Sequence, residues 1–198
     1  RSRGLGDVYK RQVQYILDSG DLKRVEAESI LAGIVLDTKG FTMRTGSRTF
    51  EAAAFLRRSG ADTGDVKKLF QNDLEGTIAK YDIIQNAKMY HEGIAVAKVD
   101  HTVGRITAAQ AADELLNISG IDTSFVLFPD QEGRVILSAR SMGDVNVQVV
   151  LEKLGGGGHR TIAGAQMEGV SIEEAKERLK EVICQMLEEE FFGGRRKA

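Results

Sequence analysis

The sequence predicts an α/β protein in two parts: the C-terminal tail of a parallel-sheet domain, and then a smaller α+β domain with a mixed sheet. Three observations predict this. An apolar run of strand length is followed by helical spacing, the pattern then changes to hairpins alternating with helices, and four glycines separate a short helix from a strand. At 198 residues, with 42% hydrophobic and 28% charged residues, the chain has the composition of an ordinary globular protein.

The first predicted domain covers residues 13–87. Its apolar run Ile30–Leu36 has the character of a strand buried on both faces of a parallel sheet, and it ends in Asp37. A carboxylate at the C-terminal end of such a strand lies where α/β folds place ligand chemistry. Helical spacing then predicts helices over residues 49–59, 63–70 (capped by Thr63) and 74–85.

The second predicted domain covers residues 88–192. It opens with a hairpin that turns at residues 91–93, and Thr107 with Gln110 forms a capping box that starts a helix. The remaining predicted elements are a hairpin around residues 129–133, a helix over 145–154, a strand over 161–167 and a final helix whose capping box is Ser171 with Glu174.

The two ends of the chain stand outside this pattern. Residues 1–12 match none of the periodicity that follows, so we expect a non-native leader there and a natural protein that continues upstream of Val13. Residues 193–198 form a short basic tail, which we expect to be frayed.

Charge and composition exclude several function classes. A net charge of −2 gives no basic face for long nucleic acid, although a small anionic ligand needs only a few local groups. No apolar run reaches the length of a membrane span, so we expect no direct membrane contact by this chain. The single Cys184 cannot form an internal disulfide, which predicts a reduced thiol and a cytoplasmic location.

The strongest local signal is the run Gly155, Gly156, Gly157 and Gly158 followed by His159. Glycine amides without side chains can approach phosphate oxygens closely, and the imidazole adds a donor that can charge near neutral pH. The alternative is a flexible turn with an incidental histidine. Four consecutive glycines carry a high entropic cost inside a compact domain, which favours phosphate binding.

Other polar residues lie at the predicted strand ends. Arg140, with Ser138 and Ser141 beside it, could clamp a phosphate or equally form a surface salt bridge. Asp37 is the candidate metal ligand, with a helix cap as its alternative. The loop that follows supplies further phosphate donors, namely Arg44, Thr45, Ser47 and Arg48.

The segments LAGIVLDTKGFTMRTGSRTFEAAAFLRRSGAD and RVILSARSMGDVNVQVVLEKLGGGGH resemble the DHH phosphoesterase family with its DHH-associated substrate-binding domain. The similarity runs from Val13 to about residue 190. Within the family, the chain is similar to the C-terminal part of the membrane-anchored cyclic-di-AMP phosphodiesterases of Firmicutes. The resemblance implies that the first domain is the C-terminal portion of a DHH domain, and that the intact parent is membrane-anchored with this part facing the cytoplasm.

The resemblance also implies a chemistry. The family holds two manganese ions, which activate a water for attack on phosphorus. Of its metal ligands only the last aspartate matches here, as Asp37, and none of the three histidines belongs to a DHH triplet. Arg140, Ser141, the glycine run and His159 would grip the nucleotide. We therefore predict that the chain alone is catalytically inactive.

Three functions follow as alternatives. The first is part of a phosphodiesterase that hydrolyses cyclic di-AMP to linear pApA. The second is a nano-RNase that acts on short oligoribonucleotides, and the third is a non-catalytic nucleotide- or RNA-binding module of the kind found in alanyl-tRNA synthetases. The expected partner is thus a cyclic dinucleotide or a short oligoribonucleotide, and a homodimer is compatible with the resemblance.

Overall fold

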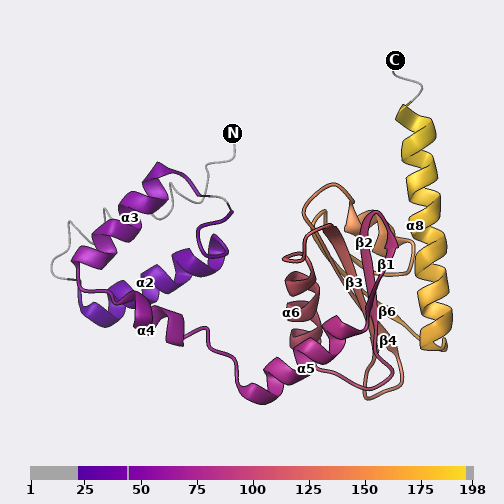
Figure 1. Cartoon of the computed structure of the whole chain (residues 1–198), viewed down its shortest axis with the longest axis horizontal. Coiled ribbons are helices and arrows are strands. Elements are labelled where there is room, and N and C mark those ends of the chain that lie inside the picture. The colour runs from indigo at the N-terminus through magenta and orange to yellow at the C-terminus, as the bar shows by residue number, and fades with distance from the viewer. Residues whose placement is uncertain (1–21, 44, 195–198) are drawn as a thin grey trace. The chain divides into compact units, whose positions relative to one another are not determined.

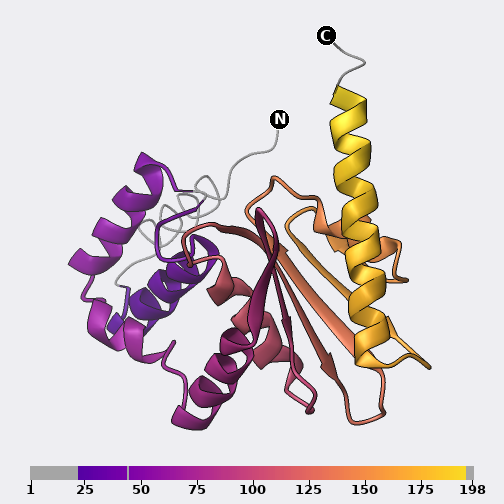
Figure 2. The same cartoon turned by 45° about the vertical axis from the view of Figure 1, so that its right-hand side comes forward.

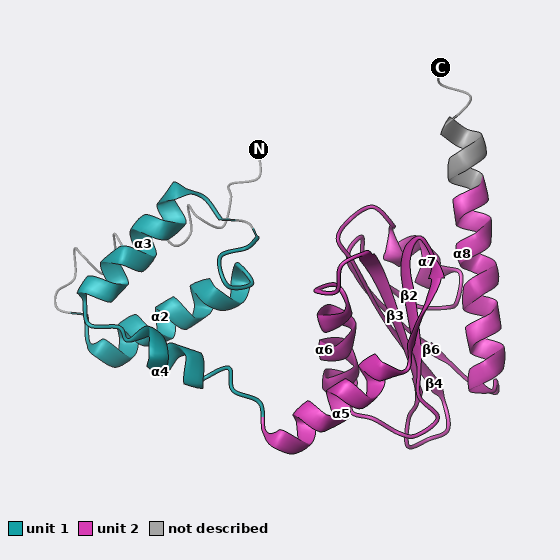
Figure 3. Cartoon of the chain, in the orientation of Figure 1, with its two compact units in different colours: residues 1–72 teal, residues 73–198 magenta. Residues whose placement is uncertain are grey.

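The computed structural model describes residues 22–43 and 45–194, with side chains as far as Glu188, and it divides the chain into two compact units (Figure 3). The predicted leader and Val13 lie outside the described residues, as does most of the basic tail. The first unit ends at Asn72 and the second begins at Asp73. The boundary expected between residues 87 and 88 therefore falls one helix later than the division between the units.

Helices alone form the described part of the first unit: α2 (Arg24–Asp37), α3 (Ser47–Arg58) and α4 (Thr63–Lys68) (Figure 1). Their apolar faces meet in a small core of residues that are at most 4% exposed, namely Ala27, Leu31, Ile34, Ala52, Leu56, Ala61 and Val66. The helix predicted over 49–59 is confirmed. Helix α4 begins where expected, but its N-cap is Asp62, whose carboxylate accepts from the amides of Gly64 and Asp65.

The strand predicted over Ile30–Leu36 is wrong, because these residues belong to helix α2. Buried positions in α2 recur at helical spacing, with Ala27, Leu31 and Ile34 inside and Leu36 65% exposed. A short apolar run does not distinguish a buried strand from a helix by periodicity, and Glu26, Ala27 and Glu28 just before it favour helix. Asp37 thus ends a helix rather than a strand, and the described part of this unit contains no parallel sheet.

The second unit is built on one mixed sheet of six strands in the order β1-β2-β3-β4-β6-β5. Strands β2 and β3 are parallel and are joined through helix α6, whereas the other neighbours are antiparallel. The predicted hairpins are confirmed. The elements are α5 (Leu74–Gln85), β1 (Ala87–His91), β2 (Gly93–Lys98), α6 (Arg105–Leu115), β3 (Ile121–Pro129), β4 (Val135–Ser141), α7 (Val147–Glu152), β5 (Gly157–His159), β6 (Ile162–Met167) and α8 (Ile172–Gly194).

Helices cover the sheet on both faces (Figure 2). Helices α5 and α6 pack on one face, where Val126 and Phe128 point into the core, and α7 and α8 pack on the other, where Phe125 and Leu127 point. We call these the α6 face and the α8 face. Because side chains alternate along a strand, each strand residue can be assigned to one face from the register.

Two details of unit 2 depart from the predictions. Helix α6 begins at Arg105 with Gly104 as its N-cap, so Thr107 lies inside the helix and not at its start. Part of the glycine run forms strand β5, which the sequence did not predict. The start of α8 does match, since the amide of Glu174 donates to the Ser171 hydroxyl at 3.2 Å. Within the part of the chain that the structure describes, no helix combines the length and apolar character needed to span a bilayer.

Candidate functional site

Strands β4, β6 and β5 place the predicted site residues in two rows across the sheet. One row joins Arg140 to Ile162 and Ile162 to His159, and the other joins Ser138 to Gly164 and Gly164 to Gly157. The rows are two residues apart, so both lie on the same face, and Arg140 pairs with Ser124 of the α6 face. We call this surface the glycine platform: Ser138, Arg140, Gly157, His159, Ile162 and Gly164.

The glycines of the run have two different roles. A Cβ on Gly156 would lie 2.2 Å from the carbonyl oxygen of Gly164, and one on Gly158 would lie 2.4 Å from that of Ile162. These two positions therefore allow β5 to approach β6 closely. A Cβ on Gly157 would meet no atom within 4 Å, so the backbone at Gly157 faces open space on the platform.

Arg140 is held in place on the platform. Its side chain is 12% exposed, and its Nε donates to Asp113 of α6 at 3.1 Å. Its Nη1 donates to the Ser138 hydroxyl at 3.3 Å and to the carbonyl of Ala139 at 2.9 Å. A guanidinium fixed by several contacts binds an anion at lower entropic cost than a free one.

Ser141 is not part of the platform, although it follows Arg140 directly. It is 5% exposed on the other face of β4, and its hydroxyl accepts from the amide of Gly143 at 2.9 Å. Thr123 contacts the same hydroxyl at 3.4 Å. Ser141 thus stabilises the turn after β4, and the structure does not bring it together with Arg140 and His159.

The platform is the uncovered part of the α6 face. Every platform-facing residue of β6 is exposed, in an alternating pattern with buried residues of the α8 face. Ile162 is 47% exposed, and His159 is also exposed. Arg105 of α6 donates to Gln166 of β6 at 3.1 Å, which places a second guanidinium beside the platform. The surface is therefore open, lined by backbone and flanked by cationic groups.

In the first unit, Asp37 is exposed at the C-terminus of α2 and leads into a constrained loop. Lys39, Gly40 and Phe41 all have positive φ (46°, 68° and 67°), and for two non-glycine residues this conformation costs about 1–3 kcal/mol each. The Thr38 hydroxyl holds the loop, because it donates to the carbonyl of Ile34 at 2.6 Å and accepts from the amide of Phe41 at 3.0 Å. The position of the Asp37 backbone is thereby defined.

Replacing Thr38 with valine tests this role of the hydroxyl. The substitution keeps the shape of a 1% exposed side chain but leaves the Phe41 amide without its acceptor. We expect the unfolding free energy of the chain to fall by about 1–2 kcal/mol, as measured by urea denaturation. Thr42→Val removes an exposed hydroxyl from the same loop and should change it by less than about 0.5 kcal/mol; equal losses in both variants would contradict the assignment.

The predicted phosphate donors of the loop lie at the start of α3. Ser47 and Arg48 are exposed in its first turn, where the helix N-terminus favours anions. Phe41 stacks on Phe50 with ring centroids 5.4 Å apart, which ties the loop after Asp37 to this turn. Arg44 lies outside the described residues.

The described residues do not by themselves fit a metal centre. Among them, no three histidine, cysteine, aspartate or glutamate side chains come close enough together to hold an ion. Asp37 can supply one carboxylate, which is fewer than the ligands that a manganese ion takes from a protein. No catalytic step can be derived from the described residues alone.

Comparison with known proteins identifies the family of the region that carries the glycine platform. The DHHA1 domain model matches residues 91–189, the part of the chain that carries the glycine platform. The chain belongs to this family.

Proteins similar to this chain over most of its length are themselves much longer. The cyclic-di-AMP phosphodiesterases GdpP of Geobacillus thermodenitrificans and Bacillus subtilis are 49% and 44% identical to it, over 82% and 87% of its length. The chain spans about a quarter of each relative (25% and 26%). The bifunctional oligoribonuclease and PAP phosphatase NrnA of Thermus thermophilus is 28% identical over 88% of the chain and 56% of its own length.

A solved structure has the same fold. The exopolyphosphatase-related protein of Bacteroides fragilis superposes with a TM-score of 0.71 at 22% identity, over 85% of this chain and 51% of its own. This likeness supports the fold.

Ile162 and Asp113 belong to the site but were not predicted from the sequence. Ile162 joins Arg140 to His159 through the register of β6, and Asp113 fixes the guanidinium from α6. Pairing across strands that are not consecutive along the chain leaves no short-range signal in the sequence. Arg140 and Ser141 were predicted to share one site, but the alternation of side chains along β4 places them on opposite faces of the sheet.

Proposed function

We propose that the DHHA1 domain of this chain binds the nucleotide substrate of a manganese-dependent phosphodiesterase that hydrolyses cyclic di-AMP to linear pApA. The glycine platform is the binding surface. In this proposal Arg140 and His159 contact phosphate oxygens, and the backbone at Gly157 and Gly164 leaves room for the ligand. The observation that carries the proposal is the alignment of Arg140, Ile162 and His159 in one row on an open face of the sheet.

Charge and shape support the proposal. A phosphodiester is an anion, so its oxygens accept charge-assisted hydrogen bonds from a guanidinium and hydrogen bonds from an imidazole N–H. Adjacent strands are about 4.8 Å apart, so the Cα atoms of Arg140 and His159 are separated by about 10 Å across β6. Residues at this separation suit a ligand that carries two phosphates, such as a cyclic dinucleotide, better than a single phosphate.

We further propose that Asp37 is one ligand of the two manganese ions in the intact protein, with the other ligands supplied from outside the described residues. Hard divalent ions take carboxylate oxygens, and Asp37 supplies an exposed carboxylate where helix α2 ends. When bound, the ions supply an activated water and stabilise the charge that develops at phosphorus.

Calorimetric titration of the 198-residue chain with cyclic di-AMP tests the binding proposal. We expect saturable binding, which His159→Ala weakens about tenfold because a hydrogen bond to a phosphate oxygen is lost. His101→Ala is the matched control, since His101 is exposed and pairs with Asp82 of α5 at 3.3 Å. The same chain with Mn²⁺ should not hydrolyse the ligand. Absence of binding, or equal weakening by both variants, would refute the platform as the site.

A nano-RNase is the second candidate function. The similarity to NrnA, which is named an oligoribonuclease, favours it. Titration with a two- or three-nucleotide RNA in parallel with cyclic di-AMP separates the two candidates by relative affinity. Weaker binding of the short RNA is the expected result.

A further inference from the structure

A second cationic surface lies on the opposite face of the sheet, in the same unit. Val96 of β2 pairs with Phe125, which pairs with Ala139, and Ala139 pairs with Ala163. This row is offset by one residue from the row of Arg140, so it lies on the α8 face. Lys88 of β1 pairs with Val96. Tyr90 lies two residues after Lys88, and Lys98 lies two residues after Val96, so all four residues lie on this face.

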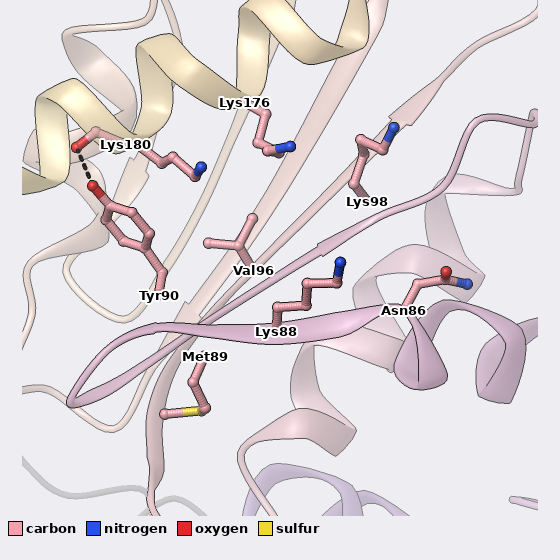
Figure 4. A pocket seen from close by; sticks show the side chains of 8 residues that line it. All are labelled: Asn86, Lys88, Met89, Tyr90, Val96, Lys98, Lys176 and Lys180. Carbon is pink, nitrogen blue, oxygen red and sulfur yellow. Dashed lines mark hydrogen bonds between the residues drawn. The ribbon is translucent and has the colours of Figure 1, made fainter.

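Four lysines converge here on one pocket of about 370 Å³ (Figure 4). Lys88 and Lys98 come from β1 and β2, and Lys176 and Lys180 come from successive turns of α8. Val96 lies among them and Tyr90 lies beside Lys180, and with the lysine stems these two side chains give the pocket an apolar wall. Its size falls within the range of small-molecule sites, which is about 300–1,000 Å³.

The carboxylates that balance these lysines do not line the pocket. Lys98 contacts Asp100 at 2.8 Å and also contacts Glu173, and Lys176 contacts Glu173 at 2.7 Å. Lys180 contacts Glu177 at 2.9 Å. These ion pairs position the ammonium groups, which are only 21–28% exposed along their side chains.

One positive charge is left in excess in the pocket. Lys88 has no ion-pair partner among the described residues, so four ammonium groups face three carboxylates. Tyr90 adds no negative charge. Its hydroxyl lies 3.1 Å from the Cys184 sulfur, and this hydrogen bond, with burial, raises the pKa of the phenol to about 12. A multivalent anion placed among these ammonium groups would be attracted by their combined positive charge.

We propose that this lysine pocket is a second ligand site, separate from the glycine platform, and that it binds a phosphorylated small molecule of mononucleotide size. Lysines act as point charges toward phosphate oxygens. The apolar wall of Val96, Tyr90 and lysine stems contacts the uncharged part of the ligand. The residues of the site all belong to the second unit, so the site does not depend on the metal centre or on the substrate proposed above.

A nuclear magnetic resonance titration of the ¹⁵N-labelled 198-residue chain tests the proposal, with AMP in one arm and inorganic pyrophosphate in the other. We expect saturable shifts of the amides of Lys88, Val96, Lys98 and Lys176 in at least one arm. Tighter binding of AMP identifies a nucleotide as the ligand, and tighter binding of pyrophosphate identifies a phosphate chain. Shifts confined to the glycine platform, or no saturable shift in either arm, would overturn the proposal.

Two variants and a matched control test whether the pocket lysines contribute to binding. Lys88→Gln and Lys180→Gln should each weaken binding about tenfold, since each removes a charged contact. Arg178→Gln removes the same charge from α8, but Arg178 pairs with Glu174 outside the pocket and should weaken binding less than about twofold. All three side chains are on the surface, and an unchanged melting temperature checks the fold. Equal weakening by Arg178→Gln would show general charge attraction and overturn the site.

Discussion

Gly156→Ala should lower the unfolding free energy of the DHHA1 domain by about 3 kcal/mol or more. The added methyl carbon would lie 2.2 Å from the Gly164 carbonyl oxygen and 2.5 Å from the Cβ of Ala165. Both contacts are to the paired strand β6, so neither can be relieved by rotating a flexible side chain. Strand β5 must move away from β6, which breaks the pairing of Gly157 with Gly164.

Thermal unfolding followed by circular dichroism measures this loss. A change of about 3 kcal/mol corresponds to a fall in Tm of about 10 °C in a unit of this size. Gly157→Ala is the matched control, because its methyl group meets no atom within 4 Å and its backbone is not left-handed. It should change the stability by less than about 0.5 kcal/mol. If the two variants melted at the same temperature, the close approach of β5 and β6 would be disproved.

The separate roles of the four glycines could not be predicted from the sequence. Four glycines in a row look alike in a sequence, and phosphate binding was inferred for all of them. The structure separates them by strand alternation: Gly156 and Gly158 allow close packing on β6, and Gly157 faces open space. The sequence could not predict this, because β5 is only three residues long and contains no apolar pattern.

The apolar run before Asp37 was easily recognised, but its pattern fits both a strand and a helix. Ile30–Leu36 was predicted to be a strand, and it is the second half of helix α2. Seven apolar residues fit either structure until the residues before them are weighed, and Ala27 and Glu28 favour a helix. The prediction that Asp37 ends a regular element nevertheless held, because the turn residues after it terminate a helix as well as a strand.

Helices with a defined apolar stripe were predicted more accurately. The spacing of Ala108, Ala111, Ala112, Leu115 and Leu116 predicts one apolar helix face; the first four are fully buried in α6, and Leu116, its C-cap, is partly buried. The helices over residues 49–59 and 74–85 were also confirmed within two residues. Local spacing is sufficient for such elements, whereas the glycine platform depends on which strands become neighbours. The order β4-β6-β5 could not be obtained from spacing alone.

Gly157→Leu should weaken binding of cyclic di-AMP about 100-fold, which corresponds to about 2.7 kcal/mol. The open space above Gly157 is the room that the proposed function assigns to the ligand, and a leucine side chain would occupy it. Because Gly157 contacts nothing on that side, the substitution should leave the Tm within about 3 °C of the parent chain. Loss of binding with retained stability is the result that a purely structural glycine would not give.

Calorimetric titration of the folded variant measures the effect. Glu152→Leu is the control, because it places a leucine at an exposed position of α7, which packs on the opposite face of the sheet. This variant should bind cyclic di-AMP as the parent chain does. Gly157→Ala adds only one methyl group and should give an intermediate loss of about tenfold. A loss that grows with side-chain size indicates that the side chain blocks the ligand sterically. A change in the backbone of β5 would not give this gradation. Unchanged affinity in Gly157→Leu would place the nucleotide elsewhere, whatever His159 and Arg140 contribute.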